Sequence, residues 1–154
     1  MDGNAKLWNA DQAYSVGNYG YVGGGTYNNT SAISGTNDDP LYHDGRYGFD
    51  AYQFDVNNGL YQVSLHFAEV FKDNLGERVF DIRIEGQTLI SNFDIVSAAG
   101  KFAAVVKTFG LQVNDGQINI VFFNVAEYPI ISAIEVVGTG TVDTKSFQKS
   151  ENFF

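Results

Sequence analysis

The chain has 154 residues, which suits one domain, and a formal net charge of −9 at pH 7. This acidic balance argues against nucleic acid and anionic membranes as partners, because both require a basic surface that displaces counterions. Apolar residues make up 44% of the chain, enough for a sizeable core, and the lack of cysteine excludes a disulfide framework, a zinc–thiolate site and a thiol nucleophile.

The first part of the chain, before about residue 40, is rich in glycine and is expected to be irregular. Residues 14–29 read YSVGNYGYVGGGTYNN, with four tyrosines and five glycines. Glycine disfavours both helices and strands, whereas tyrosine rings normally need a packed surface. The stretch therefore predicts a loop in which some rings face a ligand rather than a core.

From Tyr47 onward, apolar and polar residues alternate in GLYQVSLHFAEV, RVFDIRIEG and QINIVFFNV. A period of two over several runs predicts antiparallel strands with one buried face. Turn residues separate the runs at Asn57-Asn58-Gly59, Glu85-Gly86-Gln87 and Asn114-Asp115-Gly116. About eight strands and no helix are expected, which predicts an all-β fold, an antiparallel β-sandwich of jelly-roll type.

The domain is expected to cover residues 1–140, and residues 141–154 are expected to form a tail or linker. Within this polar segment, Phe153 and Phe154 could dock on the body of the domain. No apolar run approaches the ~18 residues of a transmembrane helix, and the start MDGNAKLW lacks a signal-peptide core. The chain is thus expected to be cytoplasmic or a module of a longer exported protein.

Enzyme motifs are absent: the sequence has no serine elbow, P-loop, H-E-x-x-H or EF-hand spacing. Glu69 and Glu127 could form a glycosidase carboxylate pair, but each is more simply explained as a loop carboxylate that holds backbone donors or an arginine. We therefore expect no catalytic residue and no cofactor. A structural calcium stays open, because oxygen ligands gather in one region, although without a fixed spacing. These ligands would be Asp38, Asp39, Asp44 and Asp50.

Aromatic residues gather where strands are predicted to begin and end. A sugar ring has an apolar C–H face and a rim of hydroxyls, so proteins hold it with aromatic faces, carboxylates and amides. The candidate ligand-binding residues are Tyr21, Tyr27, His43, Tyr47, Phe71, Glu127 and Tyr128. From composition alone, the same tyrosines could equally seal the ends of the sandwich.

Four segments within residues 41–137 resemble, in chain order, the motifs of malectin-type domains, including bacterial carbohydrate-binding modules. They are LYHDGRYG, LHFAEVFKDNLGERVFDIRIEGQTLISNFDI, AVVKTF and YPIISAIEV. The N-terminal part, WNADQAYSVGNYGYVGG, is more similar to copies attached to β-galactosidase-type glycoside hydrolases. The resemblance implies a β-sandwich that binds carbohydrate through loop aromatics and an acidic residue.

By motif, the resemblance assigns sugar stacking to Tyr47, Phe71 and Tyr27, with Tyr21 as the alternative to Tyr27. It assigns the acidic residue to Glu127. Malectin has two adjacent aromatics where this chain has Phe71 followed by Lys72, so the platform is expected to be reshaped, and a glucose disaccharide is not implied.

The resemblance implies a non-catalytic carbohydrate-binding module of a larger exported glycoside hydrolase, located outside the cytoplasm. Its expected partners are a neutral oligo- or polysaccharide and the catalytic domain of the parent enzyme. The alternative is a structural module that packs on its parent enzyme or self-associates without binding sugar. Lys72, in place of a second aromatic, favours this alternative.

Overall fold

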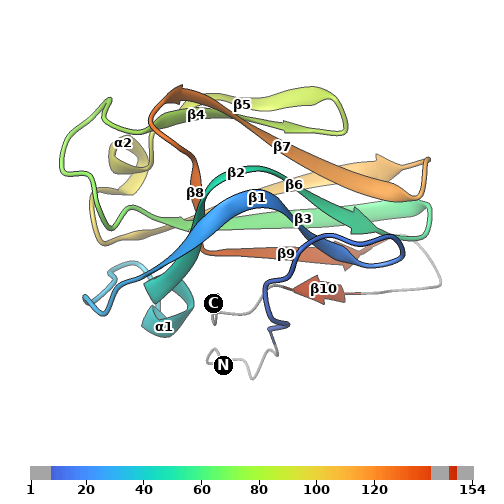
Figure 1. The fold of residues 1–154 in the computed structure, drawn as a ribbon, viewed down its shortest axis with the longest axis horizontal. Coiled ribbons are helices and arrows are strands. Elements are labelled where there is room, and N and C mark those ends of the chain that lie inside the picture. The colour runs from blue at the N-terminus through green and yellow to red at the C-terminus, as the bar shows by residue number, and fades with distance from the viewer. Residues whose placement is uncertain (1–7, 140–145, 149–154) are drawn as a thin grey trace.

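The computed structural model describes residues 8–139 and 146–148, which form two antiparallel sheets packed face to face (Figure 1). The first sheet has the order β1-β2-β7-β4-β5, with the short strand β8 paired to β2. Its strands are β1 (Tyr19–Asn28), β2 (Asp44–Asp55), β4 (Val79–Ile84), β5 (Gln87–Phe93), β7 (Gln117–Ala126) and β8 (Ile130–Ile131). The second sheet has the order β10-β9-β3-β6. Its strands are β3 (Gly59–Ala68), β6 (Ala104–Val113), β9 (Ala133–Gly138) and β10 (Ser146–Gln148).

The chain passes repeatedly between the two sheets, from β2 to β3, back to β4, and again from β5 to β6 and back to β7. The prediction of an antiparallel, jelly-roll-like β-sandwich is confirmed. The described residues contain ten strands rather than about eight. Two of them, β8 and β10, have only two and three residues, too few to produce a recognisable alternation.

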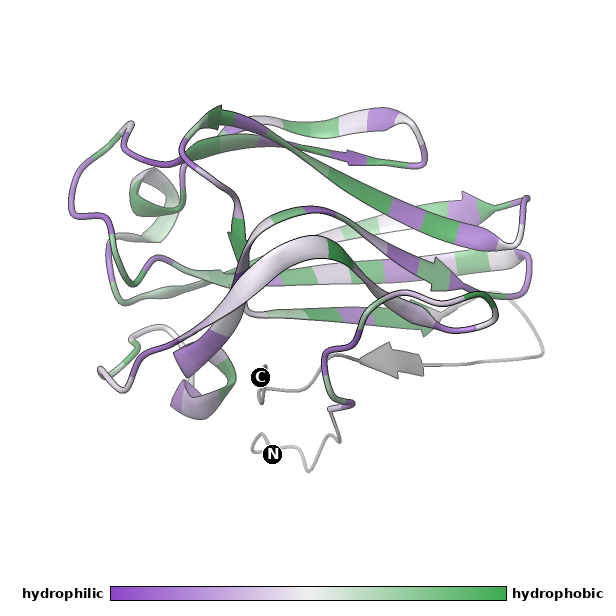
Figure 2. Ribbon diagram, viewed as in Figure 1, coloured by the Kyte–Doolittle hydropathy of each residue, from purple (hydrophilic) through white to green (hydrophobic). Residues whose placement is uncertain are grey.

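The alternating runs bury the predicted faces between the sheets. Figure 2 shows the alternation itself, as bands of hydrophobic and hydrophilic residues along the strands. The inward side chains of β3, β4 and β7 are Tyr61, Val63, Leu65, Phe67, Phe80, Ile82, Ile84, Ile118, Ile120 and Phe122. The ring centroid of Phe93 lies 5.0 Å from that of Phe67 in the opposite sheet and 5.6 Å from that of Phe80 on the neighbouring strand. Such edge-to-face rings each add ~0.5–1.5 kcal/mol beyond the effect of burial.

The three predicted turns all lie at one end of the sandwich. Between β4 and β5, the two turn residues Glu85 and Gly86 both have positive φ, 54° and 77°, as a type I′ hairpin requires. Gly116 (φ 76°) leads from β6 into β7, and Gly59 (φ 151°) begins β3.

The expectation of an irregular glycine-rich segment is wrong for Tyr19–Asn28, which forms β1 and pairs with β2. The register shifts between Val22 and Gly23, and Gly23 and Gly24 have φ values of 83° and 85°. A Cβ at Gly24 would overlap the carbonyl oxygen of Tyr47 on the neighbouring strand. The glycines therefore permit a bulged strand that lies very close to its neighbour.

The longer connections gather at the opposite end of the sandwich. They are residues 29–43, 69–78, 94–103 and 127–129, and they include the helices α1 (Asp39–His43) and α2 (Ile95–Ala99). The side chain of Asp94 accepts a hydrogen bond from the Ser97 N–H (3.2 Å) and so caps α2. This loop end carries the candidate site.

Part of the expected C-terminal tail pairs with the domain, since Ser146–Gln148 forms β10 beside β9. The predicted boundary at residue 140 stays a prediction, and Phe153 and Phe154 lie outside the described residues. Across the described part of the chain, no helix has the length and apolar character needed to cross a membrane.

Candidate functional site

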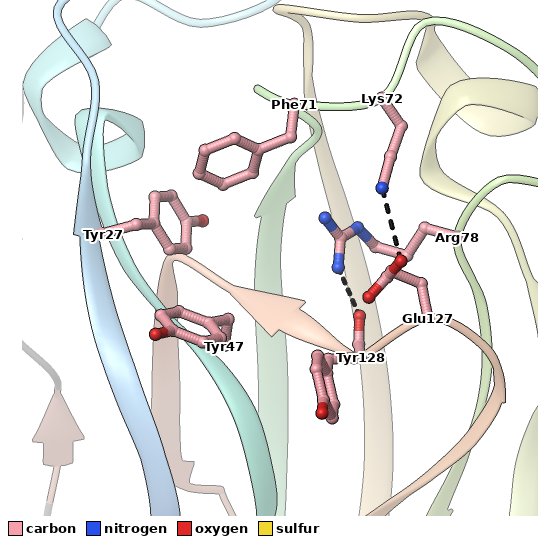
Figure 3. Close-up of a pocket in the computed structure, with 7 residues that line it drawn as sticks. All are labelled: Tyr27, Tyr47, Phe71, Lys72, Arg78, Glu127 and Tyr128. Carbon is pink, nitrogen blue, oxygen red and sulfur yellow. Dashed lines mark hydrogen bonds and ion pairs between the residues drawn. The ribbon is translucent and has the colours of Figure 1, made fainter.

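A pocket of about 390 Å³ lies at the loop end of the sandwich (Figure 3). Strands β1 and β2 supply two of its residues, and the connections 69–78 and 127–129 supply the others. The lining residues are Tyr27, Tyr47, Phe71, Lys72, Arg78, Glu127 and Tyr128. Small-molecule sites typically have volumes of about 300–1,000 Å³, so the pocket is large enough for a small ligand.

Three aromatic side chains present solvent-exposed surface in the pocket. Tyr47 is 42% exposed, Phe71 48% and Tyr128 52%, and they come from three different segments. Core packing therefore does not account for these rings. Together they form a concave apolar surface on which the C–H face of a ring-shaped ligand can stack.

Tyr27 lies deeper than the other rings, with only 9% of its surface exposed. Its ring meets that of Phe71 edge to face, at 5.2 Å between centroids and 73° between planes. Its hydroxyl lies directly over Gly45, where a Cβ would collide with it. Burial raises the pKa of Tyr27, so the hydroxyl stays neutral. Tyr27 thus supports Phe71 from within the pocket wall rather than offering an open face.

The glycine-rich strand β1 makes room for the ring of Tyr47. Gly25 is paired with Tyr47 in the β1–β2 register. A Cβ built on Gly25 would lie 3.1 Å from the Cζ atom of the Tyr47 ring, closer than an ordinary contact. The ring therefore lies over bare backbone, which connects the unusual composition of residues 14–29 to the geometry of the site.

A buried ion pair between Glu69 and Arg78, here called the floor pair, holds two pocket loops together. Glu69 Oε1 accepts a hydrogen bond from Arg78 Nε at 2.6 Å. Glu69 Oε2 accepts from the backbone N–H groups of Phe71 (3.1 Å) and Lys72 (3.2 Å). Arg78 also donates to the carbonyl oxygen of Tyr128 (Figure 3). The floor pair therefore fixes the 69–78 loop against the 127–129 loop.

A second, exposed ion pair between Lys72 and Glu127, here called the rim pair, spans one edge of the pocket. Lys72 Nζ lies 3.4 Å from Glu127 Oε2, and the two side chains are 29% and 41% exposed. Glu127 has a φ of 64°, a left-handed conformation that is uncommon for a residue other than glycine. Of the described residues that line the pocket, Glu127 alone is acidic.

The structure brings five of the seven predicted ligand-binding residues to this pocket: Tyr27, Tyr47, Phe71, Glu127 and Tyr128. Tyr21 is not among its lining residues. The Arg46 guanidinium lies 3.3 Å from the centroid of the Tyr21 ring and forms an ion pair with Asp11 at 2.9 Å. His43 ends α1, where its Nε2 lies 2.9 Å from the Ser31 carbonyl oxygen, and it does not line the pocket either.

Sequence reasoning missed two residues of the site, Lys72 and Arg78. The motif comparison identifies Lys72 only as the replacement for a second aromatic, although its position directly after Phe71 places it in the same loop. Arg78 begins the RVFD segment, and its charge next to an alternating strand was a usable signal. Its partner Glu69 lies nine positions earlier, and the sequence gives no distance between them.

Two of the four aspartates considered as calcium ligands, Asp39 and Asp44, are engaged in separate local bonds. Asp39 Oδ2 accepts from the Ile33 N–H at 3.0 Å, and Asp44 accepts from the side-chain amide of Asn28. Within the described residues, no group of three or more His, Cys, Asp or Glu side chains is placed to hold a metal ion. A structural calcium stays a prediction without a cluster to support it.

Comparisons with known proteins agree with the β-sandwich. The family model described as Malectin domain matches residues 2–143. A probable LRR receptor-like serine/threonine-protein kinase of Arabidopsis thaliana is 37% identical over 108 residues, which cover 62% of this chain and 11% of the kinase. Malectin-B of Xenopus laevis is 30% identical over 90 residues, covering 56% of this chain and 33% of that protein. The chain thus spans a third or less of these two relatives.

Among solved structures, a Bacteroides uniformis beta-glucuronidase contains a similar domain. It superimposes with a TM-score of 0.84 at 27% identity, over 90% of this chain but only 16% of the enzyme.

Proposed function

The chain belongs to the malectin domain family, a carbohydrate-binding type of fold, and we propose that it is a non-catalytic module that binds a neutral oligo- or polysaccharide. The sugar stacks on Tyr47, Phe71 and Tyr128, while Glu127 accepts hydrogen bonds from its hydroxyls. Affinity is expected in about the micromolar to millimolar range, because a solvated hydroxyl rim loses water contacts on binding.

The observation that carries this proposal is the convergence of three exposed rings and one carboxylate in a single pocket. Aromatic side chains that only close the end of the sandwich would be buried. Tyr47 and Phe71 instead each keep more than two fifths of their surface exposed. Tyr27 and the floor pair then act as supports for the stacking surface.

The proposed setting is a larger exported glycoside hydrolase, with the catalytic domain of that enzyme as partner. Supporting this, the similar domain in the Bacteroides uniformis beta-glucuronidase occupies a small part of a much longer chain. In this setting the module works outside the cytoplasm and brings the enzyme to its substrate without carrying out chemistry itself.

Isothermal titration of the purified chain against a panel of neutral glycans tests the proposal. Heat of binding is expected for at least one glycan, and it should weaken in Tyr47→Ala. The matched control is Phe123→Ala, which removes a similarly exposed ring of β7 that does not line the pocket. Lack of heat and of NMR shifts with every neutral glycan would overturn the proposal, as would equal loss in both variants.

A second candidate function is a structural module that packs on its parent enzyme or self-associates. Exposed apolar residues of β7, Phe123 and Val125, favour this candidate, because they offer a contact surface apart from the pocket lining. Sedimentation of wild type and Phe123→Ser distinguishes the two. A dimer that dissociates in the variant, together with no glycan binding, would support the structural role.

A further inference from the structure

We propose that the rim pair opens to bind two adjacent hydroxyls of a sugar, so that the ligand is a glycan whose stacked residue carries a free vicinal diol. In this complex Glu127 accepts from one hydroxyl and Lys72 donates to its neighbour. The inference rests on the proposed carbohydrate-binding function and names the chemical group that the pocket selects.

The hydrogen-bonding capacity of the rim pair supports this assignment. An ammonium group has three donors, and a carboxylate has about four acceptor positions. Among the described residues, the side chains of Lys72 and Glu127 pair only with each other, through one 3.4 Å contact. Both groups therefore keep most of their capacity for a ligand. Glu69 differs, because its two oxygens already accept three hydrogen bonds.

A vicinal diol matches a donor and an acceptor that lie side by side. Each hydroxyl can both donate and accept, so one can donate to the carboxylate while its neighbour accepts from the ammonium. The hydroxyls can also bond to each other, in the order ammonium, hydroxyl, hydroxyl, carboxylate. The exposed ion pair is weak, so inserting two hydroxyls between its members costs little.

The position of the rim pair relative to the stacking rings points to the same ligand geometry. Lys72 follows Phe71 in the chain, and Glu127 precedes Tyr128 (Figure 3). A sugar that stacks its C–H face on these rings directs its hydroxyls outward from the ring edge, toward the two charged groups.

The chemistry also predicts which sugars bind poorly. O-methylation of the diol removes both donors, so Glu127 would be left facing an ether oxygen. A uronic acid at this position would place a carboxylate against Glu127, although it would attract Lys72. Selection for a neutral diol therefore depends on both members of the rim pair.

Titrations of the purified chain with cellobiose, laminaribiose, maltose and xylobiose test the inference. The tightest binder is then compared with its 2,3- and 3,4-di-O-methyl derivatives and with a disaccharide containing glucuronic acid. The variants are Lys72→Met, which keeps the length of the side chain but removes its charge, and Lys101→Met as matched control. Lys101 is similarly exposed and pairs with Asp73 at 2.7 Å, but it does not line the pocket.

We expect one methylated derivative to bind wild type at least about fivefold more weakly, as the loss of charge-assisted hydrogen bonds implies. Lys72→Met should bind the unmodified disaccharide about fivefold more weakly and discriminate less against the methylated form. Lys101→Met should match wild type in both respects.

Three results would overturn the inference while leaving the proposed function intact. The methylated derivatives could all bind as tightly as the unmodified disaccharide, or Lys72→Met could bind that disaccharide as tightly as wild type does. The third result is that the glucuronic acid disaccharide binds more tightly than the neutral one. In each case Tyr47→Ala would still weaken binding to the tightest disaccharide. If the wild-type chain binds neither these disaccharides nor any neutral glycan of greater length, both the inference and the proposed function are wrong.

Discussion

The floor pair and the rim pair are built from the same kinds of group, yet the structure gives them opposite surroundings. Glu69 is fully buried, and its oxygens accept hydrogen bonds from one arginine and two backbone N–H groups. Glu127 is 41% exposed and meets a single lysine at 3.4 Å. Both glutamates carry the same charge, but they differ in the number of hydrogen bonds that they already accept. A carboxylate whose oxygens are fully engaged holds the pocket together, whereas one with a single partner can still bind a ligand.

The same contrast has an energetic side. Removing one member of a buried ion pair leaves an uncompensated charge in the interior, whereas an exposed pair contributes little to stability. Variants of the floor pair should therefore act first on folding, and variants of the rim pair should act only on binding.

Glu69→Ala should lower the free energy of unfolding by about 3–5 kcal/mol, because the guanidinium of Arg78 stays buried without its charged partner. Urea denaturation followed by circular dichroism measures the change. Glu127→Ala is the control and should differ from wild type by less than about 1 kcal/mol. Similar losses in the two variants would remove the proposed distinction between floor and rim.

Tyr47→Ala should weaken glycan binding by about 1–2 kcal/mol, since it deletes one exposed stacking face. Its melting temperature should stay close to that of wild type. Titration and thermal denaturation on the same preparation measure both quantities. Unchanged affinity in a natively folded variant would take Tyr47 out of the ligand site.

Glu127→Gln should reduce affinity by about 1 kcal/mol, because a charged acceptor makes stronger hydrogen bonds than an amide of nearly the same shape. Thermal stability should hardly change, since the carboxylate is exposed and bonded only to Lys72 among the described residues. The opposite pattern, lower stability with intact binding, would show that Glu127 belongs with Glu69 as a structural carboxylate.

Lys72→Met should change the free energy of unfolding by less than about 0.5 kcal/mol, as expected for loss of an exposed ion pair. Lys101→Met, which breaks another exposed pair, should behave in the same way. Urea titrations at low and high salt measure both. A loss above about 2 kcal/mol for Lys72→Met alone would mean that the rim pair stabilises the loop, against its assignment to ligand binding.

The sandwich and its core could be predicted because strands with one buried face show alternating apolar and polar residues in the sequence. Residues such as Val63, Leu65 and Phe80 alternate with polar neighbours, and the turn at Glu85-Gly86 requires residues that tolerate positive φ. Strand β1 could not be predicted in this way. Its glycines have no side chain, so they show no alternation of apolar and polar residues. Gly24 and Gly25 are needed because β1 lies very close to β2, and this contact is visible only in the folded structure.

The stacking residues of the candidate site were predictable through motif resemblance, whereas their supports were not. Tyr47 and Phe71 line the pocket as expected, but the depth of Tyr27 depends on its packing against Gly45, eighteen positions later in the sequence. The partnership of Lys72 with Glu127 links residues 55 positions apart. Neither of these contacts can be predicted from local sequence patterns. The sequence therefore identifies candidate residues but does not show which of them contact one another.

Because successive strands run in opposite directions, the turns at 57–58, 85–86 and 114–116 all lie at the end of the sandwich away from the pocket. The turns and the pocket therefore occupy opposite ends of the domain. A dye, surface linker or fused reporter attached at one of these turns would sit roughly the length of a strand from the aromatic surface. The domain could thus be immobilised with its pocket directed into solution, as a sensor for the glycan that we propose it binds.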